Sequence, residues 1–224
     1  MDVKLVSYSA AVDGLFGDNE SPDLLEMIAY CARVSNPANQ LNSETSEKLV
    51  KYLIKHQHWS PLEMVNACLM IDTTRDIAHQ IVRHRSFAFQ EFSQRYANPD
   101  EMGYPYVLRE CRLQDDKNRQ NSVETEDEDL KQEWYAQQKK VLSSAQAAYK
   151  WAIDNGIAKE QARAVLPEGL TKTRLYMNGT LRSWIHYISL RASNGTQKEH
   201  MDIARACASA IAEIFPMTDS LIEA

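Results

Sequence analysis

A short segment, Arg83 to Tyr96, gathers the residue types that ligand binding requires: RHRSFAFQEFSQRY. Arg83, His84 and Arg85 stand in succession, and neighbouring cations repel one another unless an anion joins them. Four aromatic side chains follow, among a glutamate, a serine and a third arginine. The segment is therefore either a solvated salt-bridge surface or the wall of a pocket for an anionic, planar ligand.

A helix is expected to lead into this segment, over the residues RDIAHQIVRHR. On that helix Arg75, His79 and Arg83 fall in one i, i+4, i+8 row, with Gln80 and His84 beside it. The row is either a basic face paired with acidic residues or one side of an anion site.

A strand is expected next, because aromatic residues alternate with polar ones in FAFQEFSQRYA. Side chains alternate along a strand, so Glu91, Ser93 and Arg95 would share one face. A lattice of ion pairs between strands would also explain Glu91 and Arg95. Ser93 lacks the GxSxG context of a hydrolase nucleophile, so we expect it to bind rather than to attack.

A second group of candidate residues lies near the C-terminus, in NGTLRSWIHYISLRASNGTQKEH. On the expected helix Arg182 and His186 are i, i+4 neighbours, whereas Arg191 lies on the other side, near Trp184 and Ile188. An arginine on an apolar face needs an anionic or carbonyl partner, because its charge persists at ordinary pH. That partner is a carboxylate, a neighbouring subunit or a ligand.

Other kinds of chemistry are disfavoured. The histidines show no HExxH spacing, so we predict no metal site. The four cysteines form no CxxC pair, which favours reduced thiols in a cytoplasmic protein. A net charge of −6 argues against broad binding of nucleic acid or of an anionic membrane. The sequence contains no apolar stretch of 18 residues, so no membrane-spanning helix is predicted.

The elements that must position these residues mix strands and helices without regular alternation. We therefore predict an α+β fold, a single domain over 1–224 in which a mixed, mainly antiparallel sheet packs with helices. The segment at about 98–127 is rich in turn residues and predicts a long loop; within it DDKNRQNS is either a lid or a mobile surface loop. Strands are expected at 3–9, 65–72 and 170–179, and helices at 21–35, 43–56, 128–155, 158–166, 181–192 and 197–215.

Two further features bear on these elements. Ser21 and Pro22 are expected to begin the first helix. The long helix at 128–155 has an apolar stripe that we expect to face inward: Trp134, Val141, Leu142, Ala145, Tyr149 and Ala152. No GxGxxG or GxxxxGKS/T loop occurs, so side chains would have to hold the phosphates of any nucleotide.

The central segment resembles a known signature. RHRSFAFQEFSQR has the form RHR, seven residues, Ser, one residue, Arg, and is similar to the signature of the flavin-dependent thymidylate synthases. ARVS, HWSPLE, ARAVLP and LRSWIHYISLRAS extend the resemblance over most of the chain, in the order that the family has. The resemblance implies reductive methylation of dUMP to dTMP, with methylenetetrahydrofolate as carbon donor and FAD, reduced by NADPH, as hydride carrier. It also implies a homotetramer with active sites between subunits.

The resemblance assigns roles residue by residue. Arg191 would bind the uracil ring and favour its ionisation at N3, which makes C5 nucleophilic without an enzyme thiolate. The residues expected to contact FAD are Ser35, Ser60, Glu63, Arg83, His84, Arg85, Glu91, Thr180, Leu181, Arg182 and His186. Those expected to contact dUMP are Gln80, Arg83, Glu91, Phe92, Ser93, Gln94, Arg95, Arg163 and Arg191.

Two other functions remain as alternatives. A nucleotide- or RNA-binding module would use the arginine and aromatic residues to stack bases without chemistry. A flavin reductase would oxidise NADPH without methyl transfer. For the synthase we expect dUMP as the partner, and neither nucleic acid nor a membrane.

Overall fold

The computed structural model describes residues 2–12, 14–16, 22–103 and 105–217. Its central sheet has four strands in the order β1-β2-β6-β3, and every neighbouring pair is antiparallel. This arrangement confirms the predicted α+β class. The strands are β1 Asp2–Tyr8, β2 Asn66–Thr74, β6 Lys172–Thr180 and β3 Ala88–Glu91.

The centre of the sheet is formed by β2 and β6, which pair along their whole lengths. Alternate side chains of both strands are fully buried, among them Leu69 and Ile71 of β2 and Leu175 and Met177 of β6. A strand whose period-two apolar residues all enter one core has a strongly defined register. The sheet therefore supplies a rigid base for the segments at its edges.

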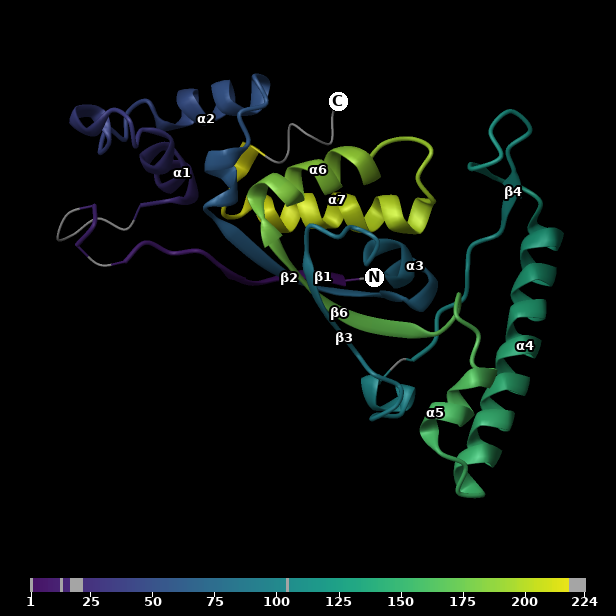
Figure 1. The fold of residues 1–224 in the computed structure, drawn as a ribbon. Helices are drawn as coiled ribbons and strands as arrows, with labels where there is room; N and C mark the ends of the chain where they lie inside the picture. The colour runs from purple at the N-terminus through teal and green to yellow at the C-terminus, as the bar shows by residue number, and fades with distance from the viewer. Residues whose placement is uncertain (1, 13, 17–21, 104, 218–224) are drawn as a thin grey trace.

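One face of this sheet is covered by α6, Leu181–Arg191, and α7, Lys198–Ala212, which lie side by side above the strands (Figure 1). The short helix α3, Arg75–Ile81, follows β2 directly and packs against α7 and the central strands. Trp184 of α6 is fully buried, and its indole N–H donates to the Ala67 carbonyl at 3.0 Å. Thr180 caps α6, since its hydroxyl accepts from Ser183 N.

The two N-terminal helices, α1 Leu24–Ala32 and α2 Ser46–Lys55, pack against each other at one end of the sheet. Asp23, and not Ser21, is the N-cap of α1; Ser21 itself lies outside the described residues. Asp23 Oδ1 accepts from Glu26 N at 2.8 Å while Glu26 Oε2 accepts from Asp23 N at 3.1 Å. This reciprocal capping box satisfies two helix N–H groups at once, which a proline start does not.

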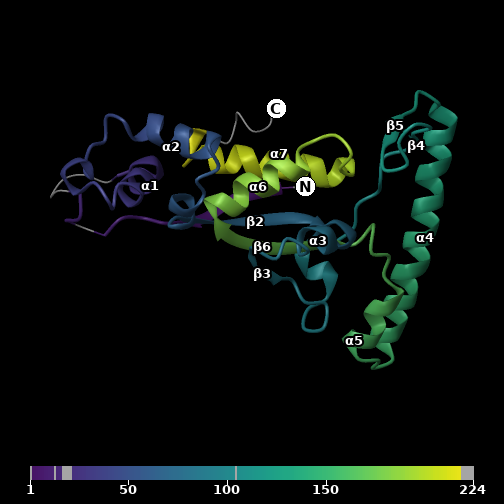
Figure 2. The same cartoon turned by 45° about the horizontal axis from the view of Figure 1, so that its top comes forward.

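The long helix α4, Glu128–Asp154, stands apart from the sheet together with the short α5, Lys159–Ala162 (Figures 1 and 2). Tyr149 and Ala152 form a small second core with α5, as the apolar stripe predicts. Leu142 and Ala145 are half-buried, but for Trp134 and Val141 the prediction is wrong, because they are 42% and 55% exposed. Helix periodicity identifies an apolar face but does not identify what covers it.

The expected loop at about 98–127 contains regular structure. A 3-10 helix spans Pro99–Met102, and β4, Arg112–Gln114, pairs with β5, Ser122–Glu124, as an antiparallel hairpin. Further 3-10 turns span Pro37–Asn39, Ser60–Glu63 and Arg163–Val165. Within the described ranges, none of the helices has the length and apolar character needed to cross a bilayer.

A close contact fixes the segment between α3 and β3. Phe87 packs on Trp184, with ring centroids 4.8 Å apart, and lies over the backbone of Gly179 in β6. A Cβ at Gly179 would stand only 2.4 Å from Phe87 Cδ1, so only glycine lets the ring approach the strand here. The buried ring holds the preceding turn, which carries His84, against α6.

Candidate active site

The Arg-His-Arg triplet lies in a turn rather than on a helix. α3 ends at Ile81, and hydrogen bonds from His84 N to Ile81 O (3.0 Å) and from Phe87 N to His84 O (3.3 Å) bend the chain. The prediction of a helix through Arg85 is therefore wrong, because the chain must turn back to bury Phe87. Arg83 and Arg85 are exposed, and neither has an ion-pair partner in the part of the chain that the structure describes.

His84 meets Arg191 at the end of α6. Arg191 Nε donates to His84 Nε2 at 2.9 Å, so this histidine nitrogen accepts and the ring is neutral. Burial lowers the pKa of His84, and the Arg191 charge lowers it further. Among the described residues no carboxylate pairs with Arg191, so a half-buried cation faces a neutral ring.

Two residues beside this pair were not found from the sequence. The Tyr187 ring meets His84 edge to face, with centroids 4.9 Å apart. His200 of α7 is fully buried and lies between Tyr187 and Gln80. The only sequence signal was that Tyr187 and His200 fall on the apolar faces of α6 and α7, where a buried polar group needs a partner.

Arg75 and His79, the first two residues of the basic row on α3, form ion pairs at the surface. Glu168 lies 3.3 Å from Arg75 Nε and 3.5 Å from His79 Nδ1. Arg75 also lies 3.4 Å from Glu91, whose carboxylate accepts from the Thr173 hydroxyl at 2.8 Å. For Arg75 and His79 the structure therefore favours the alternative of a basic face paired with acidic residues.

A second group joins the 3-10 turn Ser60–Glu63 to α6. Arg182 Nη1 lies 2.7 Å from Glu63 Oε1, and both side chains are about two-fifths exposed. The Trp59 and His186 rings pack together with centroids 4.5 Å apart. Burial lowers the pKa of His186, and the Arg182 charge adds to that shift. Four of the residues expected to contact FAD, Ser60, Glu63, Arg182 and His186, thus share one side of α6.

Other residues expected to contact FAD are placed differently. Leu181 is fully buried, and its N–H donates to Val65 O at 3.0 Å, so its side chain belongs to the core. Thr180 is occupied in capping α6. Ser35 is exposed beyond the end of α1. Among the described residues, no hydrogen bond links its side chain to Glu63 or Arg182.

The residues expected to bind dUMP continue from the edge strand. β3 ends at Glu91, so the prediction that Glu91, Ser93 and Arg95 share a strand face is wrong. Ser93 O accepts from Tyr96 N and from Ala97 N, both at 3.1 Å, which turns the chain away from β6 after Phe92 N has bonded Arg174 O. β6 itself continues to Lys172, so β3 ends because its own backbone turns and not because its partner ends.

This turn delivers its polar side chains toward α5. Arg95 Nε lies 3.5 Å from Glu160 Oε2, on the helix that leads into Arg163. Arg163 is half-buried and has no ion-pair partner among the described residues. Gln94 is 3% exposed, and within the described chain its Nε2 has no hydrogen-bond partner. A buried amide without an acceptor is costly unless a ligand or water completes it.

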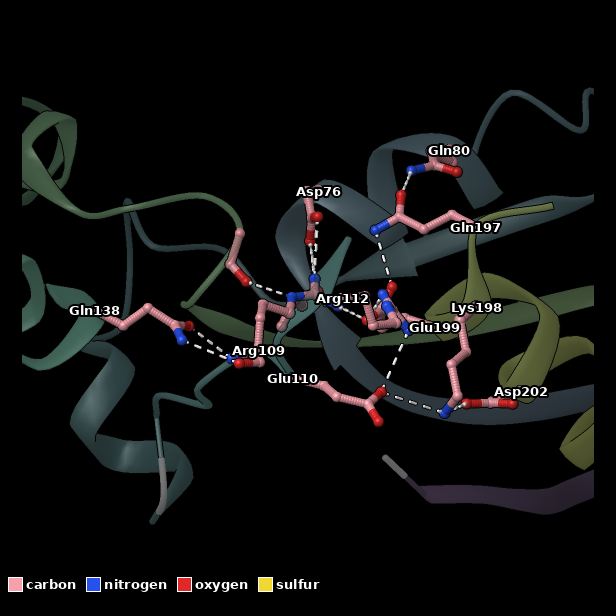
Figure 3. Close-up of polar contacts among 12 residues, drawn as sticks. Asp76, Gln80, Arg109, Glu110, Arg112, Gln138, Gln197, Lys198, Glu199 and Asp202 are labelled. Atoms are coloured by element: carbon pink, nitrogen blue, oxygen red, sulfur yellow. Dashed lines mark hydrogen bonds and ion pairs between the residues drawn. The ribbon is translucent and has the colours of Figure 1, made fainter. Parts of the chain in front are cut away.

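A network of paired charges, not predicted from the sequence, joins α3, β4 and α7. It consists of Asp76, Arg109, Arg112 and Glu199, and we call it the anchor network (Figure 3). Arg109 Nη2 donates to Asp76 Oδ1 at 2.7 Å, and Arg109 Nε donates to the Gly169 carbonyl at 3.0 Å. Arg112 Nη2 lies 2.5 Å from Glu199 Oε1.

The anchor network also holds α4. Arg109 N donates to Gln138 Oε1 at 2.7 Å, and Gln138 Nε2 donates back to Arg109 O at 2.9 Å (Figure 3). Burial raises the pKa of Glu199, but its own backbone N–H, Gln197 and the two arginines outweigh burial and lower it. Glu199 is therefore ionised, and the network closes on its own charges.

Ten of the predicted site residues form three groups in one chain. Gln80, His84 and Arg191 meet between α3, α6 and α7; Ser60, Glu63, Arg182 and His186 meet beside Trp59; Ser93, Arg95 and Arg163 lie toward α5. No hydrogen bond or ion pair among the described residues joins one group to another.

The sequence of this chain is similar to those of known proteins. A family model described as "Thymidylate synthase complementing protein" matches residues 19–217. The chain is 49% identical over 216 residues to a probable flavin-dependent thymidylate synthase of Paramecium bursaria Chlorella virus 1, covering 96% of each chain. It is 47% identical over 224 residues to a flavin-dependent thymidylate synthase of a Synechocystis species, covering all of both chains.

The chain belongs to the flavin-dependent thymidylate synthase family, and it is an enzyme of thymidylate synthesis. The family and thymidylate synthesis, both predicted from the sequence, are confirmed. A solved structure with the same fold is a UMP/dUMP methylase, PolB, from Streptomyces cacaoi, bound with 5-Br dUMP. The TM-score is 0.80 at 24% identity, over 99% of this chain and 94% of that one.

Proposed function

We propose that the chain methylates dUMP reductively to dTMP, with methylenetetrahydrofolate as carbon donor and with FAD, reduced by NADPH, as hydride carrier. The observation that carries this proposal is the Arg191 guanidinium, half-buried against a neutral His84 with no carboxylate beside it in the described chain. Such a cation is free to meet an anion, and the family's substrate becomes one when its uracil ring ionises. The neighbour bound with 5-Br dUMP supports a uracil nucleotide as the substrate.

Arg191 would act on the uracil ring. A guanidinium only donates, so beside the imide it stabilises negative charge on the ring and lowers the cost of losing the N3 proton. The ionised ring then pushes electron density toward C5, which attacks the carbon donor without a thiolate. His84 Nε2, as the acceptor from Arg191 Nε, orients the guanidinium for this task.

The phosphate of dUMP would lie toward α5. Arg95 and Arg163 supply bidentate donors there, and among the described residues the one ion-pair partner of Arg95 is the exposed Glu160 at 3.5 Å. The unpartnered Nε2 of Gln94 is a further donor in this turn. Glu91, Phe92, Ser93 and Gln80 are the remaining residues that we assign to the nucleotide.

The residues also fit a flavin. Arg83 and Arg85 are exposed cations without carboxylates among the described residues, which suits a diphosphate, and the Trp59–His186 pair offers ring faces beside the Glu63–Arg182 pair. The bound flavin would supply the hydride, after NADPH has recharged it. We assign the same contact to Ser35, Ser60, His84, Glu91, Thr180 and Leu181.

We propose a homotetramer whose active sites lie between subunits. Three groups of site residues remain separate in one chain, and α4 exposes an apolar face that includes Trp134, Val141 and Trp151, the last 62% exposed. Exposed aromatic patches of this kind mark interaction surfaces. The four cysteines are free thiols, which supports a cytoplasmic location.

The test begins with the visible absorbance spectrum of the purified protein. Bound flavin should be present, and dTMP should form only when dUMP, methylenetetrahydrofolate and NADPH are all supplied. Oxidation of NADPH that needs neither dUMP nor folate would instead indicate a flavin reductase. Binding of RNA that weakens steeply with salt, without dTMP formation, would indicate a nucleic-acid module.

A further inference from the structure

A chain of neutral hydrogen-bonding groups runs from the anchor network to the residues around Arg191. Glu199 Oε2 accepts from Gln197 Nε2 at 3.0 Å, and Gln197 Oε1 accepts from Gln80 Nε2 at 2.8 Å (Figure 3). Gln80 Oε1 then lies 3.3 Å from His200 Nδ1. His200 Nε2 lies 3.2 Å from the Tyr187 hydroxyl, at the far end of the chain.

The carboxylate of Glu199 sets the direction of every bond in this chain. An ionised carboxylate only accepts, so Gln197 must turn its nitrogen toward Glu199 and its oxygen toward Gln80. Gln80 must then give Gln197 its nitrogen, which leaves the Gln80 oxygen facing His200. His200 therefore carries its proton on Nδ1 and accepts from Tyr187 at Nε2.

The environment keeps the two rings in this state. Burial, with help from Arg191 and His84, lowers the pKa of His200 to about 3. Burial also raises the pKa of Tyr187 well above its ordinary value. Both rings are thus uncharged over the ordinary pH range, Tyr187 as a donor and His200 as a donor to Gln80.

This chain has a consequence for Gln80, which the proposed function assigns to dUMP. The Gln80 oxygen faces His200 and one of its N–H groups faces Gln197, so the second N–H is the donor that remains for a ligand. Resting on that proposed function, we propose that His200 is a positioning residue, which holds the Gln80 amide so that it presents an N–H, not a carbonyl, to an acceptor of the nucleotide. Tyr187 donates to the His200 Nε2 that this tautomer leaves unprotonated, and its ring packs against His84 with centroids 4.9 Å apart.

Two substitutions separate positioning from packing. His200→Asn keeps an amide nitrogen at the place of Nδ1, so it retains the donor to Gln80. His200→Gln keeps an amide at the place of Nε2, so it retains a partner for Tyr187 but leaves the Gln80 oxygen without its donor. Both remove the ring from the same buried site, and a merely structural role would make them behave alike.

The readout is the equilibrium Kd for dUMP, measured by titration of the flavin-loaded protein, beside the flavin absorbance itself. We expect His200→Gln to weaken dUMP binding about tenfold and His200→Asn to stay within about threefold of wild type. Flavin content should be the same in both. Equal values of Kd in the two variants, or a weaker His200→Asn, would overturn the inference.

If either His200 variant fails to fold, Gln197→Ala takes its place, because Gln197 is exposed and holds Gln80 from the other side. We expect its Kd for dUMP to rise about threefold, whereas the exposed Gln132→Ala on α4 should keep the wild-type value. An unchanged Kd in Gln197→Ala overturns the inference as well. Wild-type protein that binds no dUMP would remove the proposed function together with this inference, whereas normal wild-type binding with unresponsive variants removes the inference alone.

Discussion

Two polar groups meet at Glu199 and differ in how their charge is satisfied. The anchor network pairs two arginines with two carboxylates, and the Arg112 and Glu199 side chains are only 11% and 10% exposed. On the other side of Gln197, the group around Arg191 has one cation and several neutral partners, and no carboxylate within the described residues. We call this second set, Gln80, His84, Tyr187, Arg191 and His200, the ligand-facing group.

The difference separates structure from function. A buried network that closes on its own charges loses stability when one member is removed, and gains nothing from a ligand. A half-buried cation without an anion carries a desolvation cost that a ligand or another subunit can offset. Substitutions in the two groups should therefore change different quantities.

The largest effect is expected in the anchor network. Glu199→Ala removes the buried carboxylate 2.5 Å from Arg112 and leaves that arginine with the exposed Glu110 at 3.5 Å, so we expect the free energy of unfolding to fall by about 3–5 kcal/mol. Denaturant unfolding followed by circular dichroism measures it. Glu110→Ala is the control, because Glu110 is 48% exposed and lies 3.5 Å from the same arginine; its cost should stay below about 1 kcal/mol. Equal losses of unfolding free energy in Glu199→Ala and Glu110→Ala would contradict a structural role for the anchor network.

In the ligand-facing group, Arg191→Ala should change turnover rather than stability. Removal of one donor from a developing negative charge lowers kcat by about 10²–10³, a cost of roughly 2.7–4 kcal/mol in the barrier. Rates of dTMP formation measure it, and flavin absorbance should be retained. Arg205→Ala, on an exposed face of α7, should keep wild-type kcat. An Arg191→Ala rate within threefold of wild type would contradict the assignment.

The neutral ring of His200 makes stability depend on pH. Its pKa is about 3 in the fold against an ordinary value of 6.5, so below pH 6.5 the unfolded chain takes up a proton that the folded chain refuses. The stabilisation is present above 6.5 and is lost as the pH falls toward 3. Between pH 7 and 5 this loss is about 2 kcal/mol.

Urea unfolding at several pH values tests this dependence. His200→Asn cannot titrate, so its stability should fall less steeply with decreasing pH than that of wild type. A part of the slope should remain, because the pKa of His84 is lowered too. Identical slopes in wild type and variant would show that His200 is not held neutral.

The smallest effect on stability is expected at Glu63. The Glu63–Arg182 pair is about two-fifths exposed, so Glu63→Ala should cost less than about 1 kcal/mol of stability but should weaken flavin binding. Glu47→Ala is the matched control: it breaks the exposed pair with Lys51 and should leave flavin affinity unchanged. Flavin titrations that do not distinguish the two variants would remove Glu63 from the cofactor site.

Much of the fold could be predicted from the sequence, because it depends on local patterns. Period-two residues identify β2 and β6, and apolar faces at helical spacing identify α6 and α7, close to their observed bounds. The ends of α3 and β3 could not be predicted, since Phe87 bends the chain to reach Gly179 and β3 stops where its hydrogen bonds to β6 end. The hairpin in the expected loop pairs Leu113 with Val123, and both side chains remain exposed. Because the hairpin buries no apolar face, hydrophobic patterning does not predict it.

The sequence by itself determined which residues could do the chemistry, since the arginine and histidine blocks are readable as residue types at fixed spacing. Only the tertiary structure decided which arginines form structural ion pairs. Arg112 meets a carboxylate 87 residues away, whereas Arg191 meets a neutral histidine 107 residues away. In the sequence these arginines look alike. A charge is neutralised by whatever the fold brings within a few ångströms of it, and local patterns contain no information about that partner.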